Sequence, residues 1–586
     1  MISGKLNQKN ASVVALQILK NIKSKKFLNY QLKISSMNKI LFYGVAIALF
    51  AHSCKQAKEN NTNNGPDSLA IKAINDSSLT HYLSAIAADS LEGRKPFTNG
   101  ETKTINYLKR EFEQLGLEPG NGDSFFQEVP MVEIKSVPES KMVIQGKSGS
   151  LSLDYLTDFV AGSRRVQDEV NIKNSPLVFA GYGIVAPEYG WDDYKNLDVK
   201  GKTVVVMIND PGFSDSNLFK GKNMTYYGRW TYKFEEASRQ GAAAVLIIHD
   251  TEPAAYPWTV VRSGWSKSKL NLQSADNGMN RTVIEGWISL DKAKALFKMA
   301  GESDALFSAA RSKNFKAVDL NATTSLTVKN TIKKSVTYNV LAKIPGTTRK
   351  DEAIIYSAHW DHLGIGEKIQ GDSIYNGAVD NATGVASLFE LASAFKKSPK
   401  APNRTILFIS YTAEEQGLLG SEYYAKHPSF PLDKTVANIN MDMMGIAGKT
   451  KDIVVYGFGQ SELEDYASAS AKKQGRVVVP DPVPSSGLYY RSDHFNLAKV
   501  GVPSLFTGSG VDNVKNGREW GLKQVADFTK FRYHSPQDNF DAKTWDLSGI
   551  VQDVRLVFDM GYRLSNEDVY PKWKDGSEFK AIREKK

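Results

Sequence analysis

Three segments of the chain decide its fold: SAHWDHLG at residues 357–364, VDNATGVASLFELASAF at 379–395 and ISYTAEEQGLLGS at 409–421. Each of them places histidine or carboxylate side chains beside an apolar run that is typical of a buried strand or helix. In an open α/β sheet, functional groups gather at the carboxyl ends of parallel strands. We therefore expect these segments to build one site at one edge of an α/β sheet.

Short apolar runs predict three strands of that sheet, at 354–356 (IIY), 405–411 (TILFISY) and 436–441 (VANINM). Polar side chains that can bind metal or move protons follow these runs in turn: His359 and Asp361, then Glu414 and Glu415, then Asp442. One strand that ends in this way would prove nothing. Three such strands indicate a functional arrangement.

The side chains at these strand ends are of the types that bind metal ions. Imidazole nitrogen and carboxylate oxygen bind Zn²⁺ at roughly 2.0 to 2.2 Å, and a catalytic site keeps one position open for water. Where two ions lie about 3.5 to 4 Å apart, a carboxylate is the natural bridge. Asp380 is the candidate bridge, because apolar residues at helical spacing follow it over 385–395. Glu414 and Glu415 project differently, so one can bind metal while the other acts as a base.

Five motifs occur in order along the second half of the chain: His359-x-Asp361, Asp380-Asn381-x-x-Gly384, Glu414-Glu415-x-Gly417-Leu418-Leu419-Gly420-Ser421, Asn440-x-Asp442 and Tyr533-His534-Ser535-Pro536. As a set they resemble the co-catalytic zinc aminopeptidases. That family includes secreted bacterial leucyl-type aminopeptidases and is related to glutamate carboxypeptidase and the transferrin receptor. The resemblance implies a mixed, mainly parallel central sheet flanked by helices, and a metal-dependent exopeptidase that removes N-terminal residues from peptides.

The resemblance also implies a role for each site residue. The implied ligands are His359 and Asp442 for one metal, Glu415 and His534 for the other, and Asp380 as the bridge. The implied catalytic residues are Glu414 as general base, Asp361 as the partner that orients His359, and Tyr533 as a hydrogen-bond donor to the tetrahedral intermediate. The family further implies a cis peptide bond between Asp380 and Asn381. Two Zn²⁺ ions are the expected cofactors, although the ligand set tolerates Co²⁺ or Mn²⁺.

The composition of the 586 residues, 41% hydrophobic and 24% charged, is typical of a soluble multi-domain protein. The formal net charge of +10 could suggest a nucleic-acid or membrane partner. However, residues 1–58 hold ten lysines and no acidic residue or arginine, so the rest carries 64 basic and 64 acidic residues. The excess of positive charge therefore belongs to a leader, and the rest of the chain is neutral by this count. For this reason we expect no nucleic-acid partner, and we expect peptides as substrates.

Residues 1–54 are predicted to be that leader. Met37-Asn38-Lys39 followed by ILFYGVAIALFA at 40–51 fits a secretory signal peptide, and the apolar core is too short to span a bilayer. Cys54, the chain's single cysteine, resembles a bacterial lipoprotein processing site. We expect translation to start at Met37 and an exported, cell-envelope lipoprotein that meets the membrane only through a lipid on Cys54. A plain secretory signal with an incidental cysteine is the alternative.

The remaining chain divides into a tether and a peptidase domain with an insertion. Residues 55–67 are polar and rich in Asn, which predicts a flexible tether. Residues 68–149 and 326–586 are predicted to be the two parts of the peptidase domain. Residues 150–325 hold short β-prone runs at 177–179, 203–208 and 244–248. Within them, Phe179-Ala180-Gly181-Tyr182-Gly183-Ile184, Asp193-Tyr194 and Val199-Lys200-Gly201-Lys202 resemble a β-rich protease-associated domain. His249 in this insertion is predicted to be structural.

Further features complete the prediction for the peptidase domain. Ser90-Leu91-Glu92-Gly93-Arg94 resembles the opening of the family, and helical spacing predicts helices at 102–115 and 547–558. The run at 337–344 (TYNVLAKI) predicts an edge strand.

Other functions remain open at this point. A glutamate carboxypeptidase-like enzyme would need a cluster of arginines over its pocket, for which Arg491 and Arg532 are candidates. A glutaminyl cyclase-like enzyme would use one zinc. A non-catalytic binding lipoprotein on the same fold would have lost ligands. A serine hydrolase is excluded, because no Gly-x-Ser-x-Gly elbow follows a strand with a suitable acid and histidine after it.

Overall fold

The computed structural model of the chain describes residues 68–585. The predicted signal peptide, the lipidation site at Cys54 and the tether lie outside the described residues. Within 68–585, no helix combines the length and the apolar character needed to cross a membrane.

Four parallel strands form the centre of the main sheet, in the order β17 (Arg404–Tyr411), β14 (Arg349–His359), β18 (Thr435–Met441) and β21 (Ser504–Ser509). The flanking strands are β13 (Val318–Ile344), antiparallel to β17, and β19 (Asp452–Tyr456), antiparallel to β21, with β20 (Val477–Pro480) parallel to β19. Every residue of β17 and β18 is buried, which fits their largely apolar sequences. The three strands predicted after 350 and the mixed, mainly parallel sheet are confirmed.

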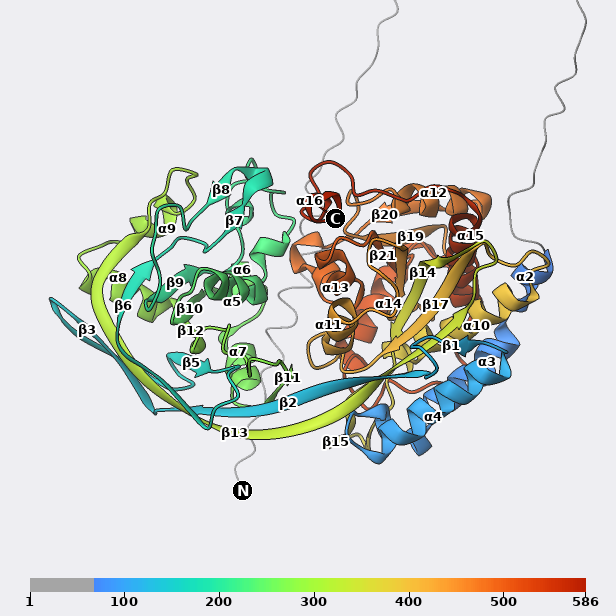
Figure 1. Cartoon of the computed structure of the whole chain (residues 1–586), viewed down its shortest axis with the longest axis horizontal. Helices are drawn as coiled ribbons and strands as arrows, with labels where there is room; N and C mark the ends of the chain where they lie inside the picture. Colours follow the sequence, from blue (N-terminus) through green and yellow to red (C-terminus); the bar gives the residue numbers. More distant parts are fainter. Residues whose placement is uncertain (1–67, 586) are drawn as a thin grey trace, which may run out of the picture. The chain divides into compact units, whose positions relative to one another are not determined.

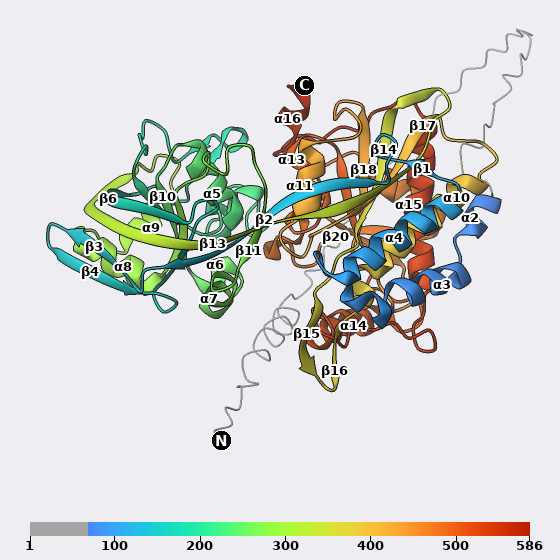
Figure 2. The same ribbon diagram turned by 60° about the horizontal axis from the view of Figure 1, so that its bottom comes forward.

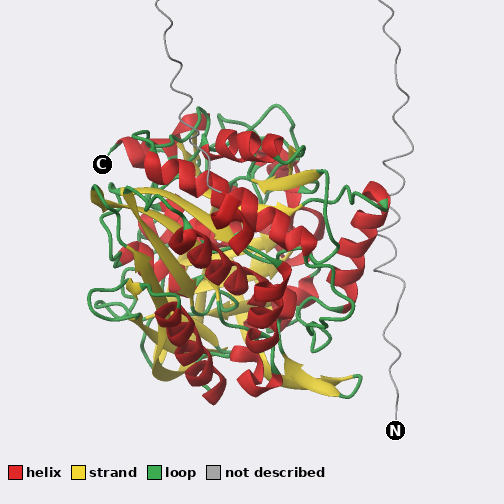
Figure 3. Cartoon of the chain, turned by 90° about the vertical axis from the view of Figure 1, so that its right-hand side faces the viewer, coloured by secondary structure: helices red, strands yellow, loops and turns green. Residues whose placement is uncertain are grey.

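Helices pack on both faces of this sheet (Figure 3). One face carries α10 (Thr383–Lys397) and α15 (Ser548–Asn566), against which lie α2 (Ser68–Ala73), α3 (Asp76–Ile86) and α4 (Asn99–Gln114) (Figure 2). The other face carries α11 (Leu419–Lys426) and α13 (His494–Lys499). The helices predicted after Asp380, at 102–115 and at 547–558 correspond to α10, α4 and α15.

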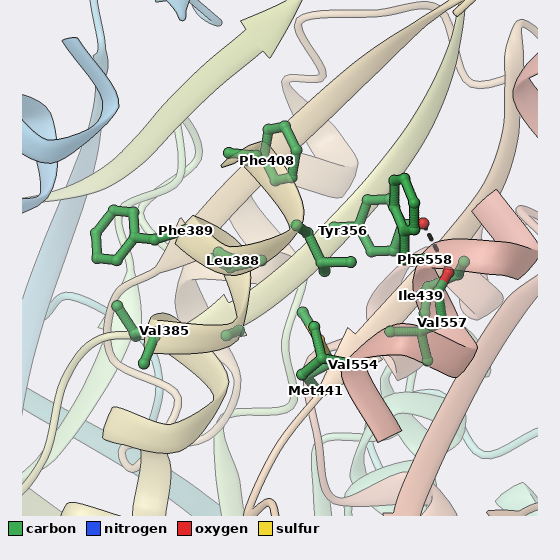
Figure 4. Packing of buried hydrophobic residues seen from close by; sticks show 14 of the residues in the cluster. Tyr356, Val385, Leu388, Phe389, Phe408, Ile439, Met441, Val554, Val557 and Phe558 are labelled. Carbon is green, nitrogen blue, oxygen red and sulfur yellow. Dashed lines mark hydrogen bonds between the residues drawn. The ribbon is translucent and has the colours of Figure 1, made fainter. Parts of the chain in front are cut away.

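The core between the sheet and α10 and α15 is closely packed (Figure 4). Tyr356 of β14 stacks on Phe408 of β17, and its hydroxyl donates a 2.8 Å hydrogen bond to the carbonyl of Val557. Gly561 permits this approach, since a Cβ there would lie 1.8 Å from the Tyr356 hydroxyl oxygen. Phe389 of α10 is fully buried in the same cluster, and truncating such a side chain costs about 3 to 5 kcal/mol. This packing fixes α10, and with it the loop before α10 that carries Asp380.

The insertion has a second parallel sheet with its own hydrophobic core (Figure 1). Its strands run in the order β6 (Glu169–Phe179), β9 (Thr203–Met207), β10 (Ala244–His249) and β12 (Ile284–Ser289), with β5 (Phe159–Gly162) antiparallel to β12. The helices α5 (Trp230–Arg239) and α8 (Leu290–Met299) cover it. The strands predicted at 177–179, 203–208 and 244–248 are therefore confirmed.

The structure corrects two sequence predictions about where the insertion joins the main sheet. β13 is not an edge strand of eight residues but spans 27, because it pairs with β2 (Phe126–Pro138) on one side and continues into the insertion. The hairpin of β3 (Lys141–Gly146) and β4 (Gly149–Asp154) contributes Met142 and Ile144 to the insertion core. The insertion therefore starts before residue 150.

The remaining elements are short or peripheral. They are β1 (Glu118–Pro119), β7 (Val185–Ala186), β8 (Trp191–Asp192), α6 (Thr251–Ala254), α7 (Trp258–Trp265), β11 (Lys269–Leu272), α9 (Ala305–Ala309), β15 (Gly364–Ile369), β16 (Asp372–Tyr375), α12 (Leu463–Lys473), α14 (Gly517–Phe531) and α16 (Lys580–Glu584).

Candidate metal centre

The carboxyl edge of the main sheet brings together the first group of predicted ligands. His359 is the last residue of β14, Asp442 directly follows β18, and Asp380 precedes α10. Nε2 of His359 lies 3.2 Å from Oδ1 of Asp380 and 3.3 Å from Oδ1 of Asp442. All three side chains are buried. Ligand atoms about 3.3 Å apart suit an ion with bonds of roughly 2.0 to 2.2 Å in tetrahedral geometry.

The second group of predicted ligands forms around the other oxygen of Asp380. Nε2 of His534 lies 3.2 Å from Oδ2 of Asp380 and 3.1 Å from Oε2 of Glu415. The two oxygens of Asp380 thus face different histidines, as a bridging carboxylate requires. The peptide bond between Asp380 and Asn381 is cis, as the family resemblance implies.

His362, which is not among the predicted ligands, also belongs to this region. Its Nδ1 lies 2.7 Å from Oε1 of Glu415, and its Nε2 is buried without a hydrogen-bond partner. His362, Asp380 and Glu415 together form a second cluster that could hold an ion. His534 nevertheless faces an oxygen of both carboxylates, whereas His362 holds the opposite oxygen of Glu415. His534 therefore stays the predicted ligand, and the position of His362 fits a residue that orients Glu415.

Glu414 stands beside the first ligand group. Its Oε2 lies 3.9 Å from Nε2 of His359. Burial raises the pKa of Glu414 well above its usual range; His359 opposes this shift, and the negative charges of Asp442 and Glu415 add to it. A carboxylate with a raised pKa is suited to accept and release a proton near neutral pH.

Asp361 contacts His359 differently from the prediction. Nδ1 of His359 donates to the backbone carbonyl of Asp361 at 3.1 Å, while its carboxylate is 3.8 Å away. That carboxylate instead accepts a 3.0 Å hydrogen bond from the backbone N–H of Glu414. Asp361 therefore orients His359 through its main chain and Glu414 through its side chain.

Tyr533 lies over the second ligand group. Its ring stacks on that of His534, with centroids 3.9 Å apart. Burial raises the pKa of the Tyr533 hydroxyl, and the charges of Asp380 and Glu415 raise it further. The hydroxyl therefore keeps its proton at neutral pH and can donate a hydrogen bond.

Two supporting residues were not predicted. The hydroxyl of Ser492 donates to Oδ2 of Asp442 at 2.6 Å, which leaves Oδ1 facing His359. Oδ2 of Asp538 accepts from the backbone N–H groups of Val379 and Asp380 at 2.9 and 3.2 Å. Neither has a local sequence signal, because the residues they contact are about 50 and 160 positions away.

The electrostatics of the cluster fit bound cations. Burial lowers the pKa of His359, but Glu414 and Asp442 raise it well above its usual range. Likewise, burial lowers the pKa of His534, but Asp380 and Glu415 raise it to about 10. Closely packed carboxylates thus favour positive charge at both histidines, where a metal ion would bind. The donor set of imidazole nitrogen and carboxylate oxygen fits zinc.

Comparison with known proteins agrees with this geometry. Residues 339–558, which hold all five predicted ligands, match the model of peptidase family M28. This part of the chain is therefore similar to peptidase family M28. The match does not extend to the insertion, whose protease-associated assignment stays a prediction.

Relatives of the chain are distant in sequence. Aminopeptidase YwaD of Bacillus subtilis (strain 168) is 24% identical over 405 residues, which cover 68% of each chain. A probable leucine aminopeptidase 2 of Aspergillus oryzae is 24% identical over 59% of each chain, and mouse aminopeptidase NAALADL1 is 35% identical over 16% of its own length. Among solved structures, an aminopeptidase from Aneurinibacillus sp. strain AM-1 is 19% identical, covers 86% of this chain and 97% of its own, and gives a TM-score of 0.45.

Proposed function

We propose that this protein is a zinc-dependent aminopeptidase that uses two metal ions to remove N-terminal residues from peptides. The observation that carries the proposal is the position of Asp380, whose two carboxylate oxygens face His359 and His534 at 3.2 Å each. One ion would be held by His359 and Asp442, and the other by His534 and Glu415, with Asp380 shared between them. The names of the relatives support the aminopeptidase direction.

Each catalytic residue then has a defined task. Two bound divalent ions would supply Lewis-acid polarisation of the scissile carbonyl and acidification of a water molecule. Glu414 takes the proton of that water on a carboxylate oxygen and delivers it to the leaving amine. The hydroxyl of Tyr533 donates to the oxygen that becomes negative in the transition state. Asp361 holds both His359 and the backbone of Glu414 in place.

The alternative of a carboxypeptidase for acidic residues has limited support. A distant relative is named probable glutamate carboxypeptidase of Arthroderma benhamiae. Of the two candidate arginines, Arg532 is engaged by Asp538 at 3.2 Å and by the carbonyl of Asn539. Arg491 forms no ion pair with any described residue. One free arginine is a weak basis for an acidic-residue pocket.

The localisation proposal rests on the leader sequence. We place the protein in the cell envelope, anchored by a lipid on Cys54, because residues 37–54 combine a basic head, an apolar core and a cysteine. Replacing Cys54 with Ala is expected to move the protein from the membrane fraction to the soluble fraction.

Hydrolysis of a panel of free and N-acetylated peptides by the purified protein tests the proposal. Cleavage that requires a free N-terminus, stops with chelator and returns with Zn²⁺ is the expected result. Cleavage of blocked peptides with acidic C-termini would favour the carboxypeptidase. Release of ammonia from N-terminal glutamine would favour a cyclase, and bound metal without turnover would favour a binding protein.

A further inference from the structure

The buried Arg94 connects three segments beneath the metal centre. Its side chain is about 1% exposed. Nε donates to the carbonyl of Trp360 at 2.8 Å, Nη1 to the carbonyls of Ile86, at 2.8 Å, and Asn376, and Nη2 to the carbonyl of Gly377 at 3.0 Å. These acceptors belong to the end of α3, the loop after β14 and the loop before Asp380.

The backbone around Arg94 is fixed in an unusual turn. Glu92, Gly93 and Arg94 have φ values of +53°, +65° and +51°. A Cβ at Gly93 would lie 2.6 Å from the carbonyl oxygens of both Gly364 and Tyr375. A larger residue at position 93 would therefore push the turn away from the site. This accounts for glycine before arginine in the segment 90–94.

Arg94 holds the loop after β14 in two ways. Its side chain binds the carbonyl of Trp360, and its own carbonyl accepts a 3.2 Å hydrogen bond from the backbone N–H of His362. That loop directly follows His359, the last residue of β14, and includes Asp361. The other loop that Arg94 holds ends at Gly377, three residues before Asp380. The two loops thus adjoin the histidine and the carboxylate that lie 3.2 Å apart in the first ligand group.

Arg94 also places a positive charge under the carboxylates. Burial lowers its pKa to about 10, and the charges of Asp380 and Asp361 oppose that shift, so the guanidinium is protonated at neutral pH. Its hydrogen bonds go to backbone carbonyls, and it forms no ion pair with any described residue. The carboxylates near it therefore stay free to face the metal positions.

We propose that Arg94 is a positioning residue that sets the distance between the loop of His359 and the loop of Asp380, and thereby the metal affinity of the site they share. The proposal rests on the metal centre described under the proposed function. A lysine cannot replace Arg94, because a single ammonium cannot reach carbonyls on three segments in the planar arrangement of a guanidinium. The sequence resemblance assigned the segment 90–94 to the family opening without any role.

The full-length variant Arg94→Lys tests this, with Arg404→Lys as matched control. Arg404 is equally buried, and its guanidinium donates to the carbonyls of Leu564, at 2.6 Å, and Val569, at 3.1 Å, away from the metal centre. For each protein we would measure the Zn²⁺ dissociation constant by chelator competition, the visible spectrum of the Co²⁺ form, kcat with saturating metal, and Tm with and without metal.

Arg94→Lys is expected to weaken Zn²⁺ binding by about 10-fold to 100-fold, the range found for groups that orient ligands, and to change the Co²⁺ spectrum. Arg404→Lys is expected to lower Tm while leaving the Zn²⁺ dissociation constant within about twofold of wild type, because it orients no ligand. Wild-type affinity and spectrum in Arg94→Lys, or an equal loss of affinity in Arg404→Lys, would overturn the proposal.

A second variant, Arg94→Gln, keeps a side-chain amide that can donate a hydrogen bond to a backbone carbonyl. It covers the case in which Arg94→Lys does not fold. It is expected to show the same loss of affinity. If neither variant folds while Arg404→Lys does, Arg94 serves folding and the positioning role is rejected. If wild type itself binds no metal, the proposed function fails, which is a separate outcome.

Discussion

The two parallel sheets of this protein each have a strand that ends in histidine, but only the histidine of the main sheet faces carboxylates. β14 of the main sheet ends in His359, and β10 of the insertion ends in His249. Nε2 of His359 faces two carboxylates at 3.2 and 3.3 Å, whereas the ring of His249 contacts the carbonyl of Tyr256 at 3.0 Å through Nε2. Within 68–585, the groups of three side chains that could hold an ion occur at the main sheet.

The buried carboxylates of the two sheets differ in the same way. Asp210 of the insertion accepts hydrogen bonds from Gly212 N–H and from both the N–H and the hydroxyl of Thr225, at 2.7 to 3.1 Å. Asp380 of the main sheet has its oxygens turned toward histidines instead. A strand end is thus a metal site only where the carboxylates are not already satisfied by the chain's own donors.

The strongest test of this difference replaces one buried aspartate in each sheet. Asp380→Asn should lower kcat by more than the roughly 10-fold to 100-fold typical of an outer partner, because it removes the shared ligand, and should release metal. Asp210→Asn should leave activity and metal content unchanged but lower the free energy of unfolding by about 1 to 3 kcal/mol. Activity assays, metal analysis and denaturation would measure these effects. Retained metal in Asp380→Asn would contradict the bridging role.

Glu414→Gln separates catalysis from metal binding within the main site. The variant should keep its metal and lose about 100-fold or more in kcat, because the general base is removed. Metal content and steady-state kinetics measured on the same preparation give the answer. A variant that loses metal would show that the roles of Glu414 and Glu415 are exchanged.

Glu390 of α10 is a buried carboxylate outside the predicted ligand set, and its pKa makes the stability of the fold depend on pH. Burial raises its pKa to about 7, although the hydroxyl of Ser78 and the N–H of Asn75 lower it. Because this pKa is higher in the folded than in the unfolded chain, its stabilisation is complete below about pH 4.5 and is lost as the pH rises through 7.

Glu390→Gln should remove that dependence. Between pH 5 and pH 8, the wild type should lose up to about 3 kcal/mol of unfolding free energy relative to the variant. Denaturant titrations at both pH values would measure this, and parallel pH profiles for the two proteins would refute the assignment.

The smallest expected effect concerns the strand-end histidine of the insertion. His249→Ala should lower the free energy of unfolding by about 1 kcal/mol through loss of its hydrogen bond. Activity and metal content should not change, as measured with the Asp210→Asn controls. A loss of metal in His249→Ala would place a metal-dependent contact in the insertion and break the comparison.

The sequence predicted what depends on local pattern. The strands before His359, Glu414 and Asp442 were visible as apolar runs, and the carboxyl ends of parallel strands meet at one edge whatever the loops between them do. The helix after Asp380 followed from helical spacing in the same way. The observed distances place all five predicted ligands in contact, while the roles of the individual residues stay predictions.

The features that escaped prediction depend on contacts between distant segments or on the main chain. The full length of β13 arises from pairing with β2, about 200 residues earlier. Asp361 meets His359 through a carbonyl, which every residue possesses, so the side-chain motif pointed to the wrong atom. Arg94 donates hydrogen bonds to loops more than 260 positions away, and the residues next to it in the sequence do not indicate which carbonyls accept them.

The most direct test of the account is a crystal structure of the zinc-loaded protein with anomalous scattering measured at the zinc edge. The account predicts two peaks about 3.5 to 4 Å apart, one on either side of Asp380, with His359 and Asp442 at one and His534 and Glu415 at the other. A single peak, or a carboxylate other than Asp380 between two peaks, would contradict it.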